Sequence, residues 1–162
     1  MSSRSALRIF FLFSFLGWII DSAYRSVLAG VLVWHGPTLP PFYPTYGLAA
    51  LLMAWVIPRV ARHPLGARIV AYAAVTSGWE LVAGLFLTHV MGWRLWDYSA
   101  STVHLLGHID LEHSTYWLLL ALLSERSVYP LVERHIMKPR AQRRVEPLSS
   151  PAESGPQTTK AA

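Results

Sequence analysis

Long apolar stretches, separated by short polar segments, occupy most of the chain before about residue 132. This pattern predicts four helical spans, at residues 7–33, 44–60, 67–91 and 112–132. A run of about 20 apolar residues matches the hydrocarbon core of a bilayer. A soluble protein with this pattern would need several unusually long buried helices in a chain too short to cover them. We therefore expect an all-α integral membrane protein, a bundle of about four transmembrane helices.

Proline and glycine mark the ends of the predicted spans. Residues 35–41 include three prolines and cannot continue a helix, because proline lacks the backbone donor and clashes with the preceding turn. Gly92 follows the third span. The fourth span is the weakest, since Glu125 and Arg126 lie inside it and Pro130 is expected to kink or end it.

Small residues four positions apart predict where helices approach one another. Ala50 and Ala54 share one face of the second span, and Ala74 and Gly78 share one face of the third. Such spacing lets helix backbones pack closely in lipid, although mere tolerance of small residues explains it equally well.

The composition agrees with a membrane protein. Hydrophobic residues make up 53% of the chain and charged residues 14%, whereas soluble domains are about 25% charged. A formal net charge of +5 suggests either nucleic acid or a membrane as partner, and in so apolar a chain membrane topology explains it more simply than nucleic acid. The chain contains no cysteine, which excludes disulfides and cysteine-based zinc sites.

The positions of the basic residues predict the topology. They precede the first span, connect the second to the third, and follow the fourth, as Arg4 and Arg8; Arg59, Arg62 and Arg68; and Arg134, Lys138, Arg140, Arg143 and Arg144. The other two connections carry Arg94 alone. Under the positive-inside rule, four spans place both termini in the cytoplasm. We expect the protein in a bacterial inner (plasma) membrane.

The two ends of the chain need separate interpretation. Arg4 and Arg8 before an apolar run are also typical of a secretory signal, but this run continues far past the usual apolar region of about 7–15 residues. We expect a retained first helix. Residues 1–133 are predicted to form the transmembrane domain, and 134–162 a basic and then disordered cytoplasmic tail, too poor in apolar residues to fold.

Three charged residues fall well inside the first and third predicted spans. Asp21 and Arg25 lie four positions apart in the first span and can pair, and Glu80 lies near the middle of the third. Each charge at bilayer depth costs several kcal/mol unless it is paired or hydrated, on the order of 3 kcal/mol by insertion scales. The functional interpretation is a polar cavity that binds an ion, a proton or a small solute. The structural alternative is an internal ion pair and a hydrogen-bonded glutamate that fix helix register.

A partly re-entrant or interfacial loop is expected between the third and fourth spans. It begins with the segment 93–99, in which two tryptophans and a tyrosine favour the membrane interface. Arg94 and Asp97 lie three apart and can pair. The segment is either an interfacial anchor or a loop that closes the outer end of the polar cavity.

The same connection contains candidate metal ligands, namely His104, His108, Asp110, Glu112 and His113. His104 and His108 have helical i, i+4 spacing, and His113 follows them. Imidazole with carboxylate suits zinc or iron, but there is no His-Glu-x-x-His motif, and ordinary loop histidines are the alternative. The chain lacks the GxxxxGK[ST] phosphate-binding loop and the GxSxG nucleophile elbow. We therefore expect no cofactor and lean against an enzyme.

Four sequence blocks together resemble the CmpB-like family, the ABC-transporter type IV membrane proteins. They are Phe-Leu-Gly-Trp-Ile-Ile-Asp-Ser at 15–22, Pro-Phe-Tyr-Pro-Thr-Tyr-Gly at 41–47, Arg-Leu-Trp-Asp-Tyr-Ser at 94–99 and Gly-His-Ile-Asp-Leu at 107–111. Relative to the family, Asp21 stands where glutamate is frequent, His35-Gly36 replaces Arg-Gly, and His104 and His108 replace asparagine and arginine. These departures suggest that the histidines are local variation. The resemblance implies a transport context without an established biochemical activity.

The sequence supports two main hypotheses and a weaker third. The first is a transport-related, permease-like subunit that binds a small solute or ion, with Asp21, Arg25 and Glu80 lining the site and Tyr46, Arg94 and Asp97 closing it from outside. Its expected partners are the lipid bilayer and either further copies of the chain or a partner membrane subunit with a separate ATPase. The second hypothesis is a structural or regulatory membrane subunit without substrate. The third is a membrane metalloenzyme that uses His104, His108 and His113.

Overall fold

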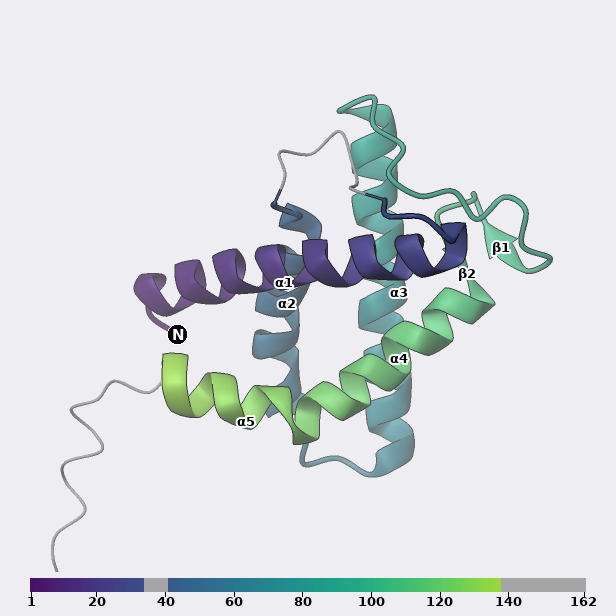
Figure 1. Ribbon diagram of the computed structural model, residues 1–162. Coiled ribbons are helices and arrows are strands. Elements are labelled where there is room, and N and C mark those ends of the chain that lie inside the picture. The colour runs from purple at the N-terminus through teal and green to yellow at the C-terminus, as the bar shows by residue number, and fades with distance from the viewer. Residues whose placement is uncertain (34–40, 138–162) are drawn as a thin grey trace, which may run out of the picture.

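The computed structural model describes residues 1–33 and 41–137, which are mostly helical (Figure 1). The helices are α1 (Ser3–Ala29), α2 (Pro44–Val60), α3 (Leu65–His89), α4 (Leu111–Arg126) and α5 (Val128–Val132), followed by a π-helical turn, η1 (Glu133–Met137). Two short antiparallel strands, β1 (His104–Leu105) and β2 (Ile109–Asp110), lie in the loop before α4. The all-α prediction is confirmed. The predicted 35–40 turn, with His35 and Gly36, and most of the predicted tail lie outside the described residues.

The helix ends follow from local sequence. The side chain of Ser2 accepts a hydrogen bond from the Ser5 amide and caps the start of α1. Gly30, at φ 68°, ends α1 in the left-handed conformation. Pro44 occupies the first turn of α2, where a missing amide hydrogen costs nothing. Asp110 caps α4 by accepting the His113 amide. The α2 bounds are those that the sequence predicts.

The four predicted spans are only partly matched by the helices. Among the described helices, α1 and α3 are long and apolar enough to cross a membrane, whereas α2 is apolar but has 17 residues. The predicted fourth span is divided, because α4 ends at Arg126 and α5 begins at Val128. Pro130 explains the break, since its ring excludes the carbonyl four residues earlier, that of Arg126. The four-span bundle is therefore not confirmed by helix length.

The helices cross steeply instead of lying alongside one another as in a simple up-and-down bundle (Figure 1). α1 packs mainly on α2, and α3 mainly on α4. Glycines permit the α1–α2 crossing: a Cβ at Gly17 would overlap the ring of Tyr46, and one at Gly47 would overlap the Ser14 hydroxyl. By contrast, a Cβ at Gly78 would meet open space, so no helix among the described residues packs on the predicted Ala74–Gly78 face.

Three small apolar clusters hold the described residues together. One joins α2, α3 and α4 through Val56, Ile57, Tyr72 and Ala121. The second joins α1, α2 and α5 through Ile9, Ala54 and Val132. The third packs Trp18, Tyr43 and Leu95 beneath the loop after α3. A further tie joins the two ends of the fold, because the Ser5 hydroxyl donates to the carbonyl of Ile136 at 2.9 Å.

Candidate functional site

Residues 90–110, here called the cap, connect α3 to α4 and fold back over the helix ends. The Trp93 amide donates to the Leu87 carbonyl at 2.8 Å, which turns the chain back at the end of α3. Arg25 of α1 donates through Nη2 to the Leu95 carbonyl at 3.0 Å. The cap is therefore attached to both α1 and α3. It is the loop that the sequence predicts to be interfacial or re-entrant.

A tight turn within the cap fixes the position of Tyr98. Leu106 and Gly107 both have positive φ, 55° and 69°, and they connect the two short strands. The Tyr98 amide donates to the Gly107 carbonyl at 2.8 Å. A Cβ at Gly107 would lie 2.5 Å from Arg94 Nη2 and from Ser99 Oγ, so only glycine fits this approach. The turn thus directs the Tyr98 side chain toward α3.

Glu80 is the buried carboxyl group at the centre of the site. Its side chain projects from α3 and the residue is 6% exposed. Oε1 accepts hydrogen bonds from the Tyr98 hydroxyl at 3.0 Å and from Trp117 Nε1 of α4 at 3.1 Å. Oε2 is buried and has no hydrogen-bond partner among the described residues. Glu80 therefore joins α3, α4 and the cap while one of its oxygens remains unsatisfied.

Asp21 and Arg25 form the ion pair expected from their spacing, with 2.8 Å between Oδ2 and Nε. Their hydrogen bonds go to each other and to the cap, whereas those of Glu80 go to the cap and α4. Tyr46 of α2 connects the two groups. Its hydroxyl lies close enough to Asp21, Arg25 and Glu80 for each charge to act on it, and its ring lies 5.6 Å from that of Trp117. The three charges are thus neighbours around Tyr46 and not one bonded cluster.

A second carboxylate, Asp110, organises the start of α4. It is 4% exposed. Oδ1 accepts the His113 amide at 2.8 Å and lies 2.9 Å from His113 Nδ1, and Oδ2 accepts the Ser101 hydroxyl at 2.6 Å. Burial acts to raise the pKa of Asp110, but the hydrogen bonds from Ser101 and His113 outweigh it and hold the pKa below its ordinary value. Asp110 is therefore ionised at neutral pH.

The Asp110 and Glu80 networks meet at Tyr98. The His113 ring stacks on the Tyr98 ring with centroids 4.1 Å apart and planes 18° apart. Burial and the hydrogen bond to Glu80 raise the pKa of Tyr98, so its hydroxyl stays protonated and donates to Glu80. A continuous series of contacts thus runs from Asp110 through His113 and Tyr98 to Glu80.

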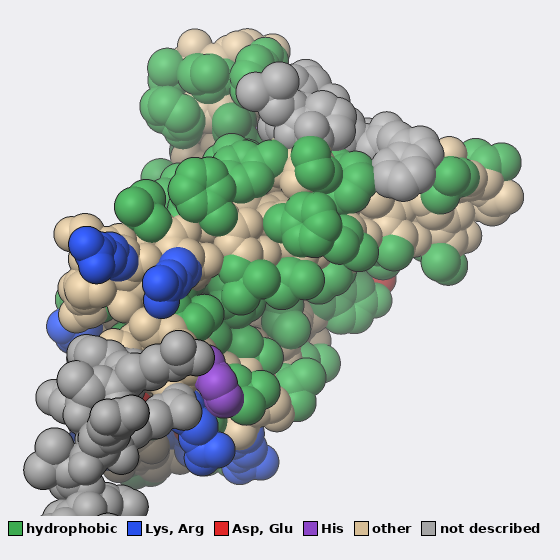
Figure 2. Space-filling model, turned by 60° about the vertical axis from the view of Figure 1, so that its left-hand side comes forward, with side chains coloured by type: hydrophobic (Ala, Val, Ile, Leu, Met, Phe, Trp, Pro, Cys, Tyr) green, Lys and Arg blue, Asp and Glu red, His purple; other side chains and the backbone are tan. Residues whose placement is uncertain are grey.

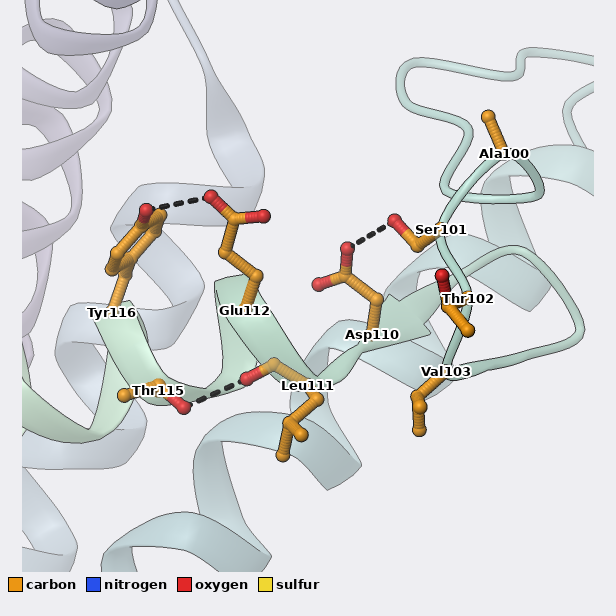
Figure 3. Close-up of a pocket in the computed structure, with 9 residues that line it drawn as sticks. All are labelled: Ala100, Ser101, Thr102, Val103, Asp110, Leu111, Glu112, Thr115 and Tyr116. Carbon is orange, nitrogen blue, oxygen red and sulfur yellow. Dashed lines mark hydrogen bonds between the residues drawn. The ribbon is translucent and has the colours of Figure 1, made fainter.

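An open cavity of about 540 Å³ lies beside Asp110, between the cap and the first turns of α4 (Figure 3). Ser101 and Glu112 add polar groups to its lining, and Tyr116 donates to Glu112 at 2.6 Å. Figure 3 shows Ser101 bonded to Asp110 at one side of the cavity and Tyr116 bonded to Glu112 at the other. Its remaining lining residues are Ala100, Thr102, Val103, Leu111 and Thr115. The cavity therefore gives solvent access to the Asp110 end of the network.

Arg94 and Asp97 form an ion pair on the surface of the cap. Arg94 Nη2 lies 2.8 Å from Asp97 Oδ1, and the two side chains are 42% and 49% exposed. Hydrogen bonds from the Ser99 hydroxyl and amide lower the pKa of Asp97. The pair does not contact Glu80 directly. It holds the loop in which Tyr98 reaches Glu80.

The three candidate histidine ligands lie apart. His104 is exposed and accepts the Gly107 amide at 3.2 Å, whereas His113 bonds Asp110. His108 is 3% exposed and packs on α3 at Gly84. Burial lowers the pKa of His108, and the positive charges of Arg94 and His89 lower it further. Residues 1–33 and 41–137 contain no group of three or more His, Asp or Glu side chains placed to hold a metal, so the metalloenzyme alternative gains no support.

Sequence reasoning missed the direct partners of Glu80. Tyr98 was visible only as part of an aromatic segment, and Trp117 only as an apolar residue of the fourth span. Both donors depend on how the cap folds back and on the register of α4 against α3. The order of residues in an isolated span carries no signal for either.

The family model described as "Putative ABC-transporter type IV", the CmpB family, matches residues 8–146. The chain belongs to this family. No curated protein and no solved structure matches the chain. Three of the blocks that carry the CmpB resemblance meet at the site, and they contribute Tyr46, Tyr98 and Asp110 from segments 41–47, 94–99 and 107–111. The residues that mark the chain as a CmpB protein therefore surround Glu80.

Proposed function

We propose that this CmpB protein is a multi-pass membrane protein that binds a small polar solute or ion at Glu80 within a transport assembly. The observation that carries the proposal is the unsatisfied Oε2 of a glutamate only 6% exposed, in the middle of an apolar helix. A buried carboxyl oxygen without a partner is destabilising by about 1–3 kcal/mol or more. Its presence in a helix with the length and composition of a membrane span favours a ligand-binding role.

The surface of the described residues supports placement in a bilayer. Large apolar side chains cover the face shown in Figure 2, while the Lys and Arg side chains gather toward one end of it. Phe11, Ile20 and Val27 of α1 are 55%, 61% and 80% exposed, and Val70 of α3 is 68% exposed. A contiguous patch of exposed apolar side chains marks a surface that contacts another protein or a membrane. Lipid chains supply the apolar partner that water does not.

The helix ends support a single orientation. Three helix ends carry arginine residues, and they lie on the left and lower sides of Figure 1. They are the start of α1, the α2–α3 connection and the end of α5 with η1. The cap and the start of α2 lie on the opposite sides. Tilted helices between these two sides are compatible with four crossings, with the arginine side cytoplasmic. We accordingly propose residues 1–133 as the membrane domain, 134–162 as a cytoplasmic tail, and a bacterial inner membrane as the location.

Each sequence-predicted residue has a defined place in this proposal. Asp21, Arg25 and Tyr46 supply the polar wall on the α1–α2 side of Glu80. Arg94 and Asp97 stabilise the cap that covers the site from outside. A chain of this size forms a small pathway by itself, so further copies or a partner membrane subunit complete it, and an ATPase of another chain supplies energy.

The proposal is tested by ligand-dependent stabilisation of the purified protein in detergent. A panel of small amines, amino acids, sugars, inorganic anions and metal cations is screened for a rise in thermal unfolding temperature. A true ligand stabilises the parent protein and loses that effect in Glu80→Gln. It retains the effect in Glu112→Gln, which changes an exposed carboxylate on α4. A solute that stabilises the parent and Glu80→Gln equally contradicts a site at Glu80.

A structural or regulatory subunit without substrate is the second candidate. It is favoured by the two hydrogen bonds of Glu80 Oε1, which join three elements and so fix their positions. Under this candidate Glu80→Gln changes only stability and assembly, because it alters a buried group that joins α3, α4 and the cap. Size-exclusion chromatography of the parent and the variant then differs, while no solute of the panel stabilises either.

A further inference from the structure

We propose that the ligand of Glu80 is a proton, which exchanges with the cap side of the protein at His113. This inference deepens the proposed function and rests on it in placing Glu80 at bilayer depth. It names the bound ion and the side from which that ion arrives.

The two oxygens of Glu80 are occupied differently, and the difference fits a neutral carboxylic acid. Oε1 accepts two hydrogen bonds, one for each lone pair of a carbonyl oxygen. Oε2 accepts none from the described residues. In a neutral carboxylic acid the hydroxyl oxygen carries its own proton, so Oε2 leaves one neutral O–H without an acceptor among the described residues, whereas an ionised Oε2 would leave a buried charge without a donor. The proton therefore sits on Oε2, and Oε1 is the carbonyl oxygen that Tyr98 and Trp117 hold.

The groups that face Glu80 from each neighbouring element leave it without a direct cationic partner in the described chain. Its donors are the neutral Tyr98 of the cap and Trp117 of α4. His113 and Asp110 act on it only at longer range and with opposite signs, and Tyr46 of α2 is neutral. Arg25 of α1 is already paired with Asp21. An ionised Glu80 thus lacks the compensation that a buried charge requires, whereas a protonated Glu80 does not need it.

His113, whose ring stacks on that of Tyr98 next to Glu80, is the base to which we assign this proton on the cap side. Its Nδ1–H donates to Asp110 Oδ1 at 2.9 Å, which leaves Nε2 with the free lone pair. When the proton leaves Glu80 Oε2 and binds His113 Nε2, the carboxylate and the imidazolium are created together. Each then stabilises the other, and Asp110 stabilises the imidazolium directly. One proton shared between Glu80 and His113 conserves charge across the transfer.

The route opens toward the cap and is closed in the other direction. Asp110, the partner of His113, lines the open cavity of about 540 Å³ (Figure 3). On the side of Glu80 toward the arginine-bearing ends, the apolar cluster of Val56, Ile57, Tyr72 and Ala121 fills the space between α2, α3 and α4. The open cavity therefore ends at Asp110, which is bonded to His113, whereas apolar side chains close the opposite end. The proton therefore enters from the cap side.

Infrared difference spectroscopy of the protein in lipid vesicles tests the proposal directly. A protonated buried carboxyl group gives a carbonyl stretching band that carboxylates lack and that shifts in heavy water. We expect this band at neutral pH in the parent, its loss in Glu80→Gln and its retention in Glu112→Gln. Asp110 does not contribute, because its lowered pKa keeps it ionised. Absence of the band at neutral pH in the parent overturns the proposal.

A second variant keeps the test valid where Glu80→Gln fails to fold. In His113→Asn the band persists, but the pH at which it disappears rises, because the carboxylate loses the imidazolium that stabilises it. An unchanged titration in His113→Asn contradicts the role of His113. This readout is independent of the solute screen. If the Glu80 band is present and no solute stabilises the protein, solute binding is contradicted and the proton site is supported. If a solute stabilises the protein through Glu80 and the band is absent, the proton site is contradicted and solute binding is supported.

Discussion

Arg68 of α3 and Glu125 of α4 form a buried ion pair in which Nη2 and Oε1 lie 2.6 Å apart. The two side chains are 13% and 11% exposed. Oε2 of Glu125 accepts Arg68 Nε at 3.0 Å and the Tyr72 hydroxyl at 2.6 Å. Every oxygen of this carboxylate is thus bonded, in contrast to Glu80 at the other end of the α3–α4 contact. The pair holds α3 against α4, and neither oxygen of Glu125 is left unsatisfied to bind a ligand.

Replacing Glu125 by glutamine is expected to destabilise the protein strongly. The substitution leaves Arg68 buried without an opposite charge, and breaking a buried pair costs about 3–5 kcal/mol. Thermal unfolding in detergent measures the loss. The matched control is Glu112→Gln on the same helix, where the carboxylate is exposed and the cost should be small. Equal unfolding temperatures for the two variants would mean that the Arg68–Glu125 pair does not hold α3 to α4.

Gly84→Ala is expected to displace the cap. A Cβ at Gly84 would lie 2.7 Å from Nδ1 and 2.9 Å from Cγ of His108, so the buried ring must move. Overpacking of this kind costs about 1–3 kcal/mol. Gly78→Ala is the control on the same helix, because its added methyl group meets open space. Faster proteolysis within residues 90–110 in Gly84→Ala, but not in Gly78→Ala, supports the contact, and identical digestion patterns contradict it.

His108 predicts a specific dependence of stability on pH. Its pKa in the folded protein is lowered, mainly by burial, from an ordinary value near 6.5. The unfolded chain therefore binds a proton at His108 more readily, and stability falls as the pH drops below about 6.5 toward the folded pKa. Thermal unfolding measured across pH should show this decline in the parent and a smaller one in His108→Gln. His104→Gln changes an exposed histidine and should retain the decline of the parent.

The absence of cysteine makes the topology directly testable, since an introduced thiol is the only one in the chain. His63→Cys places a thiol in the α2–α3 connection, and Thr102→Cys places one in the cap. In intact cells a membrane-impermeant maleimide should label Thr102→Cys alone, and His63→Cys should react only after the membrane is permeabilised. Labelling of both positions in intact cells would contradict an arrangement with the arginine side in the cytoplasm.

The sequence predicted those features that depend on neighbours along the chain. Pro44 fixed the start of α2, Pro130 divided the last helical segment, and the Asp21–Arg25 pair follows from one helical turn. Small-residue spacing predicted helix packing only in part: Ala50 and Ala54 pack in the cluster with Ile9 of α1, whereas Gly78 meets open space. Gly17 and Gly47 admit neighbouring helices because Tyr46 and Ser14 happen to face them, and this depends on a crossing that no single span encodes.

The sequence predicted Glu80, the central residue of the candidate site, but not its hydrogen-bond donors. Glu80 stands out because it is the only Asp, Glu, Lys or Arg between Ile69 and Met91. Its donors Tyr98 and Trp117 come from 18 and 37 residues away, brought in by the folded cap and by the pairing of α3 with α4. Hydrogen bonds between distant segments are set by tertiary structure, and a periodic pattern within one helix holds no information about them.

The bond from the Ser5 hydroxyl to the Ile136 carbonyl brings the beginning and the end of the folded region to one place. The chain consequently forms a nearly closed loop, held by this bond and by the packing of Ile9 against Val132. If α1 swings away from α5 during a working cycle, this bond and this packing separate together. A fluorescent donor and acceptor attached near these two positions would therefore act as a gauge of that swing, without any label near Glu80.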